Sequence, residues 1–107
     1  MSTVSIHVLD AVTGTPAAGV AVTLTDASGV AVAAAQTDPD GRVGSLAADL
    51  TPGIYRVRFD TGNYFATREV TAFYPEVVIA FEISDGDGHY HVPLLLSPFA
   101  YSTYRGS

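Results

Sequence analysis

The sequence contains neither cysteine nor lysine, and tryptophan is absent as well. Without cysteine, disulfides, thiol catalysis and cysteine-ligated zinc are excluded; without lysine, so is Schiff-base chemistry on a lysine amine. No apolar run approaches the roughly 18 residues of a membrane-spanning helix. The opening stretch MSTVSIHVLD has no basic segment and no long apolar run. We therefore expect no signal peptide, no membrane association and a cytoplasmic location.

Charge narrows the possible partners further. The formal net charge is −6, and all five basic residues are arginines. This balance argues against binding nucleic acid, whose affinity depends on cations at phosphates.

A length of 107 residues suits one domain, residues 1–107. A chain of this size buries only about 65% of its unfolded surface on folding, which leaves little room for a deep pocket within one subunit. A site shared between subunits would ease this limit.

Apolar residues alternate with polar ones along most of the chain, which predicts strands. In TVSIHVLD, Val4, Ile6 and Val8 lie on one face, with Ser5 and His7 on the other. Further strands are predicted in GVAVTLTD, VAVAAAQT, IYRVRFD, PEVVIAFEIS, HYHVPLLLS and AYSTYRG, with a short one around 43–46 and a short helix near 63–67. Seven or eight short strands, with turns about every 8–12 residues, indicate an all-β sandwich or barrel.

Histidines supply the first candidates for chemistry. His89 and His91 are two residues apart on a predicted strand, so both side chains lie on one face. The ordinary interpretation is a polar strand face; a proton-transfer pair or part of a metal site is the functional one. By parity, His7 faces solvent or another subunit. A closed zinc site would need carboxylates as well, since the chain has only three histidines.

Pro93 lies inside this histidine-bearing strand and cannot donate a hydrogen bond to a neighbour. We therefore predict that the strand is an edge or is bulged there. An edge strand carrying Leu94, Leu95 and Leu96 would need a cover. The simplest cover is another subunit, which predicts oligomerisation close to the histidine pair.

Turn sequences carry the remaining charged candidates. DPDG, residues 38–41, predicts a type I turn, so Asp38 and Asp40 are interpreted as turn residues. Arg42 follows directly; it is either a solvated charge or a planar fork for a carbonyl or an oxyanion, and Arg105 has the same two interpretations. DGDG, residues 85–88, lacks the other ligands of a calcium loop and is also interpreted as a turn. These signals alone do not name a reaction.

Several motifs together resemble one known family. HVLD near the start, DGR after the turn, and the tail HYHVPLLLSPFAYSTYRGS are similar to motifs of the 5-hydroxyisourate hydrolases, the enzymatic branch of the transthyretin-like family. YRVRFDTGNYF and FYPEVVIAFEI fit the same family. The resemblance spans Ile6 to Ser107, and the YRGS ending is its most specific part.

The resemblance implies a prealbumin-like sandwich of two four-stranded antiparallel sheets with one short helix, in a homotetramer built as a dimer of dimers. It also implies hydrolysis of 5-hydroxyisourate to 2-oxo-4-hydroxy-4-carboxy-5-ureidoimidazoline, a step of urate breakdown, without a metal or organic cofactor. By position, His7, Arg42 and His91 match the family's catalytic residues. His7 and Arg42, with Tyr104 and Ser107 of the terminal motif, are implied to contact substrate.

Two alternatives from other classes remain open. TPAAGVAVTLTDASGVAVAAAQTDPDGRV is also similar to small β-sandwich binding modules of secreted proteins, although these lack a YRGS ending. A transthyretin-like carrier of small ligands is the second alternative. The carrier branch lacks the counterparts of His7 and Arg42 and the YRGS motif, which favours the enzyme.

Overall fold

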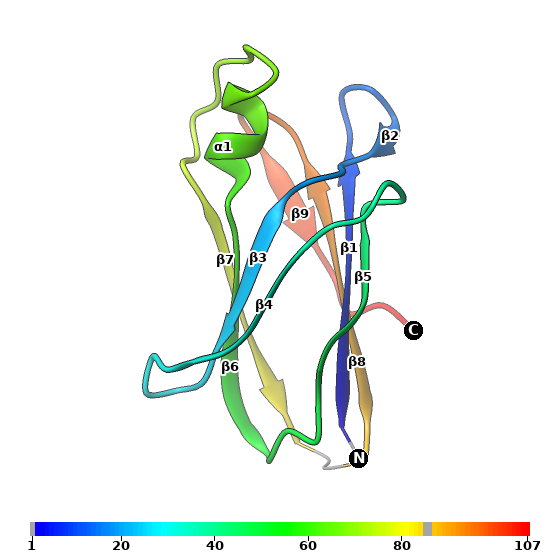
Figure 1. Ribbon diagram of the computed structural model, residues 1–107, viewed down its shortest axis with the longest axis vertical. Helices are drawn as coiled ribbons and strands as arrows, with labels where there is room; N and C mark the ends of the chain where they lie inside the picture. Colours follow the sequence, from blue (N-terminus) through cyan, green and yellow to red (C-terminus); the bar gives the residue numbers. More distant parts are fainter. Residues whose placement is uncertain (1, 85–86) are drawn as a thin grey trace.

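Two β-sheets face each other in the computed structural model, and one short helix closes one end of the sandwich (Figure 1). The structure describes residues 2–84 and 87–107. Its elements are β1 (Thr3–Asp10), β2 (Thr15–Pro16), β3 (Ala21–Thr25), β4 (Ala31–Gln36), β5 (Arg42–Ala48), β6 (Gly53–Phe59), α1 (Thr61–Ala66), β7 (Val77–Ile83), β8 (His89–Leu96) and β9 (Tyr101–Thr103). This architecture confirms the predicted all-β sandwich with a short helix.

The first sheet has the order β2-β1-β8-β9, and β5 also pairs with β1. The two-residue β2 and the longer β5 pair with different parts of β1, so β2 is an addition to the expected four strands. One pair departs from the antiparallel expectation: β1 and β8 run parallel, with Ser5 opposite His91. The second sheet, β4-β3-β6-β7, is antiparallel throughout.

Alternation in the strands places the core as predicted. Val4, Ile6 and Val8 of β1 are buried, and His7 lies on the outer side of its sheet. In β6, Tyr55 and the other alternate apolar residues are buried while the arginines between them are exposed. Each fully buried aliphatic side chain of this kind contributes about 1.5–3 kcal/mol. The sandwich core thus fixes which residues of β1 and β8 face outward.

Pro93 predicts an edge strand or a bulge, and of these two alternatives the edge strand is wrong. β8 is an inner strand, because β1 pairs with one side of it and β9 with the other. Pro93 has no N–H to donate to a neighbouring strand. The pairing of β8 with β9 stops at Leu94, which lies opposite Thr103, so no partner on β9 needs that donor. Pairing resumes only as a bridge between His91 and Gly106. The proline interrupts one ladder and does not end the sheet.

The leucines that follow Pro93 belong to the core rather than to an exposed surface. Leu94 and Leu96 are completely buried or nearly so, and Leu95 is half-buried. The expectation that this leucine run needs another subunit as a cover is therefore wrong. Parity explains the result, since Leu94 and Leu96 point into the sandwich from a central strand.

The DPDG turn forms as predicted and positions Arg42. The Gly41 amide donates to the Asp38 carbonyl at 2.8 Å, and the Asp38 carboxylate accepts from the amides of Asp40 and Arg42. Gly41 has φ +73°, and a Cβ there would lie 2.4 Å from the Val8 carbonyl oxygen. Only glycine permits this approach, which brings the start of β5 against β1. The predicted DGDG turn includes residues 85 and 86, which lie outside the described residues.

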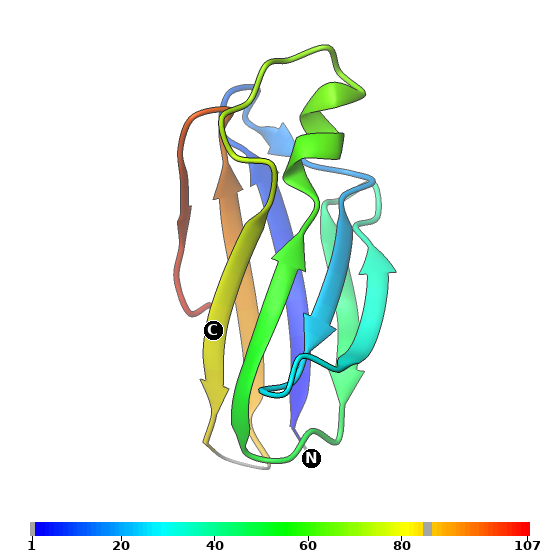
Figure 2. The same ribbon diagram turned by 90° about the vertical axis from the view of Figure 1, so that its left-hand side faces the viewer.

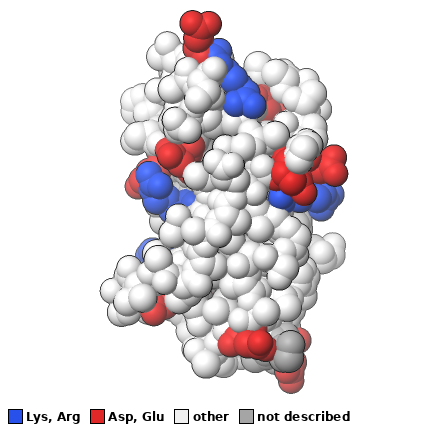
Figure 3. Space-filling model, viewed as in Figure 1, with Lys and Arg blue, Asp and Glu red and all other residues white. Residues whose placement is uncertain are grey.

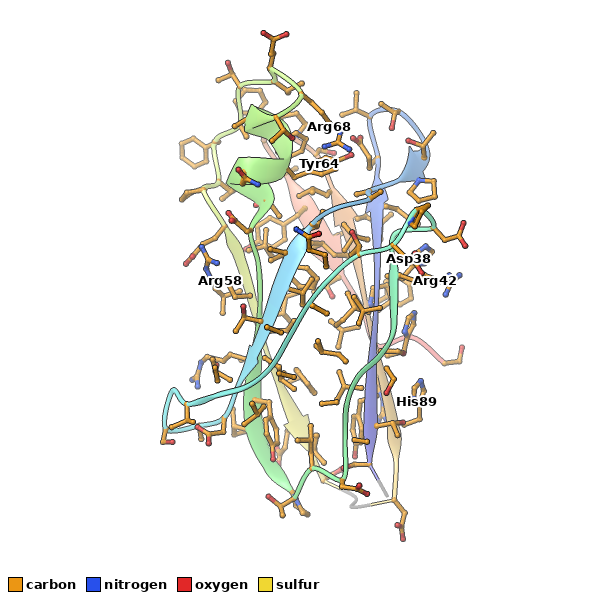
Figure 4. The ribbon with its side chains drawn as sticks, in the orientation of Figure 1. Asp38, Arg42, Arg58, Tyr64, Arg68 and His89 are labelled. Carbon is orange, nitrogen blue, oxygen red and sulfur yellow. The ribbon has the colours of Figure 1, made fainter. Side chains whose placement is uncertain are left out.

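Helix α1 begins two residues before the predicted start and is tied to the end of β1. The Tyr64 hydroxyl donates to the buried Asp10 carboxylate at 2.9 Å, and Asp10 also accepts from the amides of Val12 and Thr13. The Arg68 guanidinium lies 3.7 Å from the centre of the Tyr64 ring, and both side chains are labelled in Figure 4. Burial and the Asp10 hydrogen bond raise the pKa of Tyr64. This cluster fastens the helix to the end of the first sheet.

On the face shown in Figure 3, charged groups of both signs lie near the margins, without a basic stripe. In the described part of the chain, no helix is long and apolar enough to cross a membrane.

Candidate active site

Three neighbouring strands bring the predicted residues together on the outer face of the first sheet. Antiparallel pairing of β5 with β1 places Arg42 opposite His7. Parallel pairing of β1 with β8 places Ser5 opposite His91. Alternate residues of a strand share a face, so Ser5 and His7 point to the same side. His7, Arg42 and His91 therefore meet across adjacent strands although they are far apart in the sequence.

His89 lies on the same face, as the H-x-H spacing predicts. It is opposite Thr3 of β1, one step along the sheet from the pair of Ser5 and His91. Figure 4 shows the side chains of Arg42 and His89 on the same side of the molecule, directed away from the second sheet. The histidine face is thus exposed in one protomer and belongs to the surface of the sandwich.

Hydrogen bonds link the two histidines through Ser5. Its Oγ lies 2.7 Å from His91 Nδ1 and 3.1 Å from His89 Nε2. His89 Nδ1 in turn lies 2.5 Å from Thr3 Oγ1. Ser5 is buried, whereas His89 at the other end of these contacts is exposed. His91 is therefore held at Nδ1, which leaves Nε2 as the nitrogen free for chemistry.

The terminal motif folds back over β8 and touches His91. The Gly106 amide donates to the His91 carbonyl at 2.9 Å. A Cβ on Gly106 would lie only 2.3 Å from His91 Cδ2, so the glycine backbone packs directly against the ring. Gly106 and Ser5 together fix the position of the imidazole. The need for glycine in the YRGS motif follows from this contact.

A surface cavity of about 250 Å³ lies between these elements. It is lined by Ser5, Ile6, Arg42, Gly44, His89, His91 and Ser107. Three predicted site residues, Arg42, His91 and Ser107, thus border one space. His7 does not line this space directly, but it is paired with Arg42 at the margin.

Tyr104 lies elsewhere. It borders a second, mostly apolar cavity of about 330 Å³ with residues of β7 and β8, and its side chain is exposed. The Arg105 guanidinium lies 4.7 Å from the centre of the Tyr90 ring in the same region. His91 borders both cavities. We place the chemistry in the smaller cavity because its lining carries Arg42 and two imidazoles, whereas the larger one is an apolar opening at the edge of the sandwich.

Electrostatics favour a neutral His91. Burial lowers its pKa below the ordinary value of 6.5, and the positive fields of His7, Arg42 and His89 lower it further. A histidine with a lowered pKa is unprotonated near neutral pH and can accept a proton there. His91 therefore has the protonation state that a general base requires.

Arg42 is free to bind an anion or a carbonyl. Its backbone is fixed by Asp38, whereas its exposed guanidinium has no hydrogen bond or ion pair within residues 2–84 and 87–107. The same region contains no group of three or more histidine, cysteine or acidic side chains that could hold a metal ion. For hydrolysis this site offers His91 as a base, the Arg42 guanidinium, and His7 as a second imidazole.

Sequence reasoning missed Thr3, Ser5 and Gly106 as parts of this site. The available signal was parity, which already placed Ser5 on the same face of its strand as His7. Contact with His91 depends on a parallel pairing between strands at opposite ends of the chain. No local pattern in the sequence specifies that pairing.

Comparison with known proteins gives matches over nearly the whole chain. The family model described as the HIUase/Transthyretin family matches residues 4–106. A curated 5-hydroxyisourate hydrolase of Salmonella typhimurium is 47% identical over 108 residues, covering 96% of this chain and 79% of the relative.

Solved structures give the same result. The structure of Klebsiella pneumoniae 5-hydroxyisourate hydrolase superposes with a TM-score of 0.92 at 41% identity, covering 100% of this chain and 94% of the other. Transthyretin from Sparus aurata superposes with a TM-score of 0.90 at 36% identity, covering 97% and 96%. The fold is therefore common to a hydrolase and a transthyretin.

Proposed function

The chain belongs to the HIUase/transthyretin family, and from this premise we propose that it hydrolyses 5-hydroxyisourate to 2-oxo-4-hydroxy-4-carboxy-5-ureidoimidazoline. The observation that carries the proposal is the meeting of His7, Arg42 and His91 on three adjacent strands beside one cavity. Relatives named as this hydrolase match nearly the whole chain.

In the proposed reaction, water attacks the carbonyl of a cyclic amide and the ring C–N bond breaks. His91 is the general base that takes a proton from the attacking water at Nε2. Its lowered pKa supports this role, because the neutral form is available near neutral pH. The hydrogen bond at Nδ1 holds the ring so that Nε2 faces outward.

Arg42 and His7 supply the other two roles. The unpaired Arg42 fork binds a substrate carbonyl and stabilises the negative charge that develops on oxygen when water adds. His7, opposite Arg42, orients the substrate and protonates the leaving nitrogen. Ser107 closes one side of the cavity, and Tyr104 contacts substrate only if it turns from its neighbouring cavity. No metal or organic cofactor takes part in this scheme.

A small-ligand carrier is the second candidate function, favoured by the likeness to transthyretin. The site argues for the enzyme, because a carrier has no need of a neutral imidazole held beside a free guanidinium. The two functions differ in stoichiometry: a carrier binds ligand once, whereas an enzyme removes many equivalents.

The deciding experiment treats urate with uricase and follows the absorbance of the 5-hydroxyisourate formed, with and without this protein. Catalytic acceleration of its decay supports the hydrolase, and stoichiometric binding without turnover supports the carrier. His91→Ala and His7→Ala are each expected to lose about 10²–10⁴-fold in turnover while keeping their oligomeric state. Near-full activity of both variants would refute the residue assignment.

We propose in addition that the working form is a homotetramer, a dimer of dimers. β7 and β9 each pair on one side only in the protomer, so each leaves an open edge. The views in Figures 1 and 2 place these edges on the same side of the sandwich. Phe73, Phe99, Tyr101 and Tyr104 are exposed around them. Open edges and clustered aromatics are features that natural proteins normally cover.

Assembly also bears on the site. The cavity beside His91 is shallow, and one protomer leaves the outer face of the first sheet uncovered. A second subunit on this face would exclude water and strengthen the field of Arg42 on the substrate. Sedimentation velocity tests the proposal. A tetramer at the concentration of the activity assay supports it, and a fully active monomer refutes it.

A further inference from the structure

The strongest unused feature is the row of polar side chains behind His91. Thr3, His89, Ser5 and His91 form a continuous chain of contacts at 2.5, 3.1 and 2.7 Å. Both ring nitrogens of His89 are engaged in it. The chain begins at the outer end of the β1–β8 pair and finishes at the proposed base. The catalytic scheme above uses only its last member.

Counting hydrogens restricts what this chain can do. A neutral imidazole has one N–H donor and one acceptor nitrogen, and a serine hydroxyl has one hydrogen. If the buried Ser5 hydroxyl donates its one hydrogen to either His89 or His91, only two arrangements of the hydrogens on the two rings are possible. Either both histidines carry hydrogen on Nδ1, or both carry it on Nε2. The tautomers of His89 and His91 are therefore tied to each other.

We propose that Thr3, His89 and Ser5 form a proton relay that sets the tautomer of His91 and moves its charge away from the cavity. The proposal rests on the proposed hydrolase function. His89 and Ser5 are positioning residues in this scheme, because they act through His91 and not on the substrate.

The proton steps balance without any redox partner. With hydrogen on Nδ1 of both rings, His91 Nε2 has a free lone pair and takes a proton from water. His91 then passes its Nδ1 proton to Ser5 Oγ as the Ser5 hydrogen moves to His89 Nε2. His89 releases its Nδ1 proton toward Thr3 and solvent. One proton enters at His91 and one leaves at His89.

The direction of transfer follows from the charges that surround His91. His7 on β1 and Arg42 on β5 place positive charge beside it, whereas His89 is one step farther along β8 and exposed. From the tail, the Arg105 guanidinium donates to the His89 carbonyl at 3.4 Å. Hydrolysis of an amide also yields a carboxylic acid that ionises near neutral pH, so each turnover leaves a proton to be removed.

The first test is a measurement of tautomers that does not depend on activity. Nitrogen-15 shifts of the two imidazoles report which nitrogen carries hydrogen. In the native protein we expect both His89 and His91 to carry hydrogen on Nδ1. Ser5→Ala should let the two rings take their tautomers independently. Opposite tautomers in the native protein would overturn the relay even if the enzyme is fully active.

Kinetics supply the second test. His89→Gln keeps a hydrogen-bonding amide but cannot carry a proton, and His89→Ala removes both abilities. We expect kcat to fall by about tenfold or more in both, with KM within about threefold. A purely structural role would instead be rescued by glutamine. Rescue of kcat by His89→Gln would therefore refute the relay.

A matched control separates the relay from the loss of any hydroxyl. Ser28→Ala removes a serine whose hydroxyl donates to Asp26 in an exposed turn far from the site. It is expected to keep native kcat, whereas Ser5→Ala is expected to lose about tenfold or more. Equal activity of the two variants contradicts the proposal. If the native protein does not hydrolyse 5-hydroxyisourate, the hydrolase proposal fails, and the tautomer measurement still tests the coupling.

Discussion

Gly106→Ala tests the contact that holds the proposed base in place. The new Cβ would lie 2.3 Å from His91 Cδ2 and 3.0 Å from Cγ. Carbon atoms pack at about 3.5–4.0 Å, so the ring or the tail must move by about 1 Å or more. A shift of the ring stretches the 2.7 Å contact between His91 Nδ1 and Ser5. Misplacement of a reacting group by about 1 Å costs on the order of 10²-fold in rate.

The assay is the decay of freshly made 5-hydroxyisourate, with thermal unfolding measured in parallel. We expect kcat of Gly106→Ala to fall on the order of 10²-fold with little change in melting temperature, because the contact lies at the surface. Gly29→Ala supplies the converse control: Gly29 has φ +87° in a distant turn, so alanine there costs about 1–2 kcal/mol of stability and leaves turnover intact. Native activity in Gly106→Ala would refute the claim that this glycine positions His91.

Three other predictions concern the charge, pH response and stability of the molecule. Arg42→Lys should reduce kcat/KM by about 10²-fold, since an ammonium cannot reproduce the planar fork; native kinetics would exclude that role. Because the pKa of His91 is lowered, the acid limb of kcat/KM should lie below pH 6.5, and a limb above this value would contradict His91 as the base. Tyr64→Phe removes the hydrogen bond to Asp10 Oδ2, leaves that buried oxygen without its Tyr64 donor, and should cost about 1–3 kcal/mol in urea unfolding. Tyr74→Phe is its control, because the Tyr74 hydroxyl has no hydrogen bond in the described ranges, and equal losses would argue against the anchor.

Local patterns were sufficient for the strands and for the direction of their side chains. Alternation placed Val4 and Ile6 inward and His7 outward, and the H-x-H spacing placed both histidines on one face. These inferences succeed because side-chain direction in a strand depends only on residue parity. The identity of the site came from the family resemblance, since no composition rule distinguishes a catalytic Arg42 from a solvated one.

Inferences that required strand neighbours failed or were missing. Pro93 predicts an edge or a bulge, yet β8 lies between β1 and β9, and the proline falls in a gap of the β9 ladder. Ser5 was not selected, because its contact with His91 spans 86 residues of sequence. Pairing of this kind is decided by the packing of both sheets together, and sequence periodicity carries no information about it.

The parallel pairing of β1 with β8 also has a consequence for folding. The contacts between Ser5 and the two histidines join residues 84 and 86 positions apart. Contacts with such long sequence separation form slowly, because the chain must first lose the entropy of closing a large loop. Neither half of the site can bind or react before that closure. The site is therefore complete only when β1 and β8 have paired.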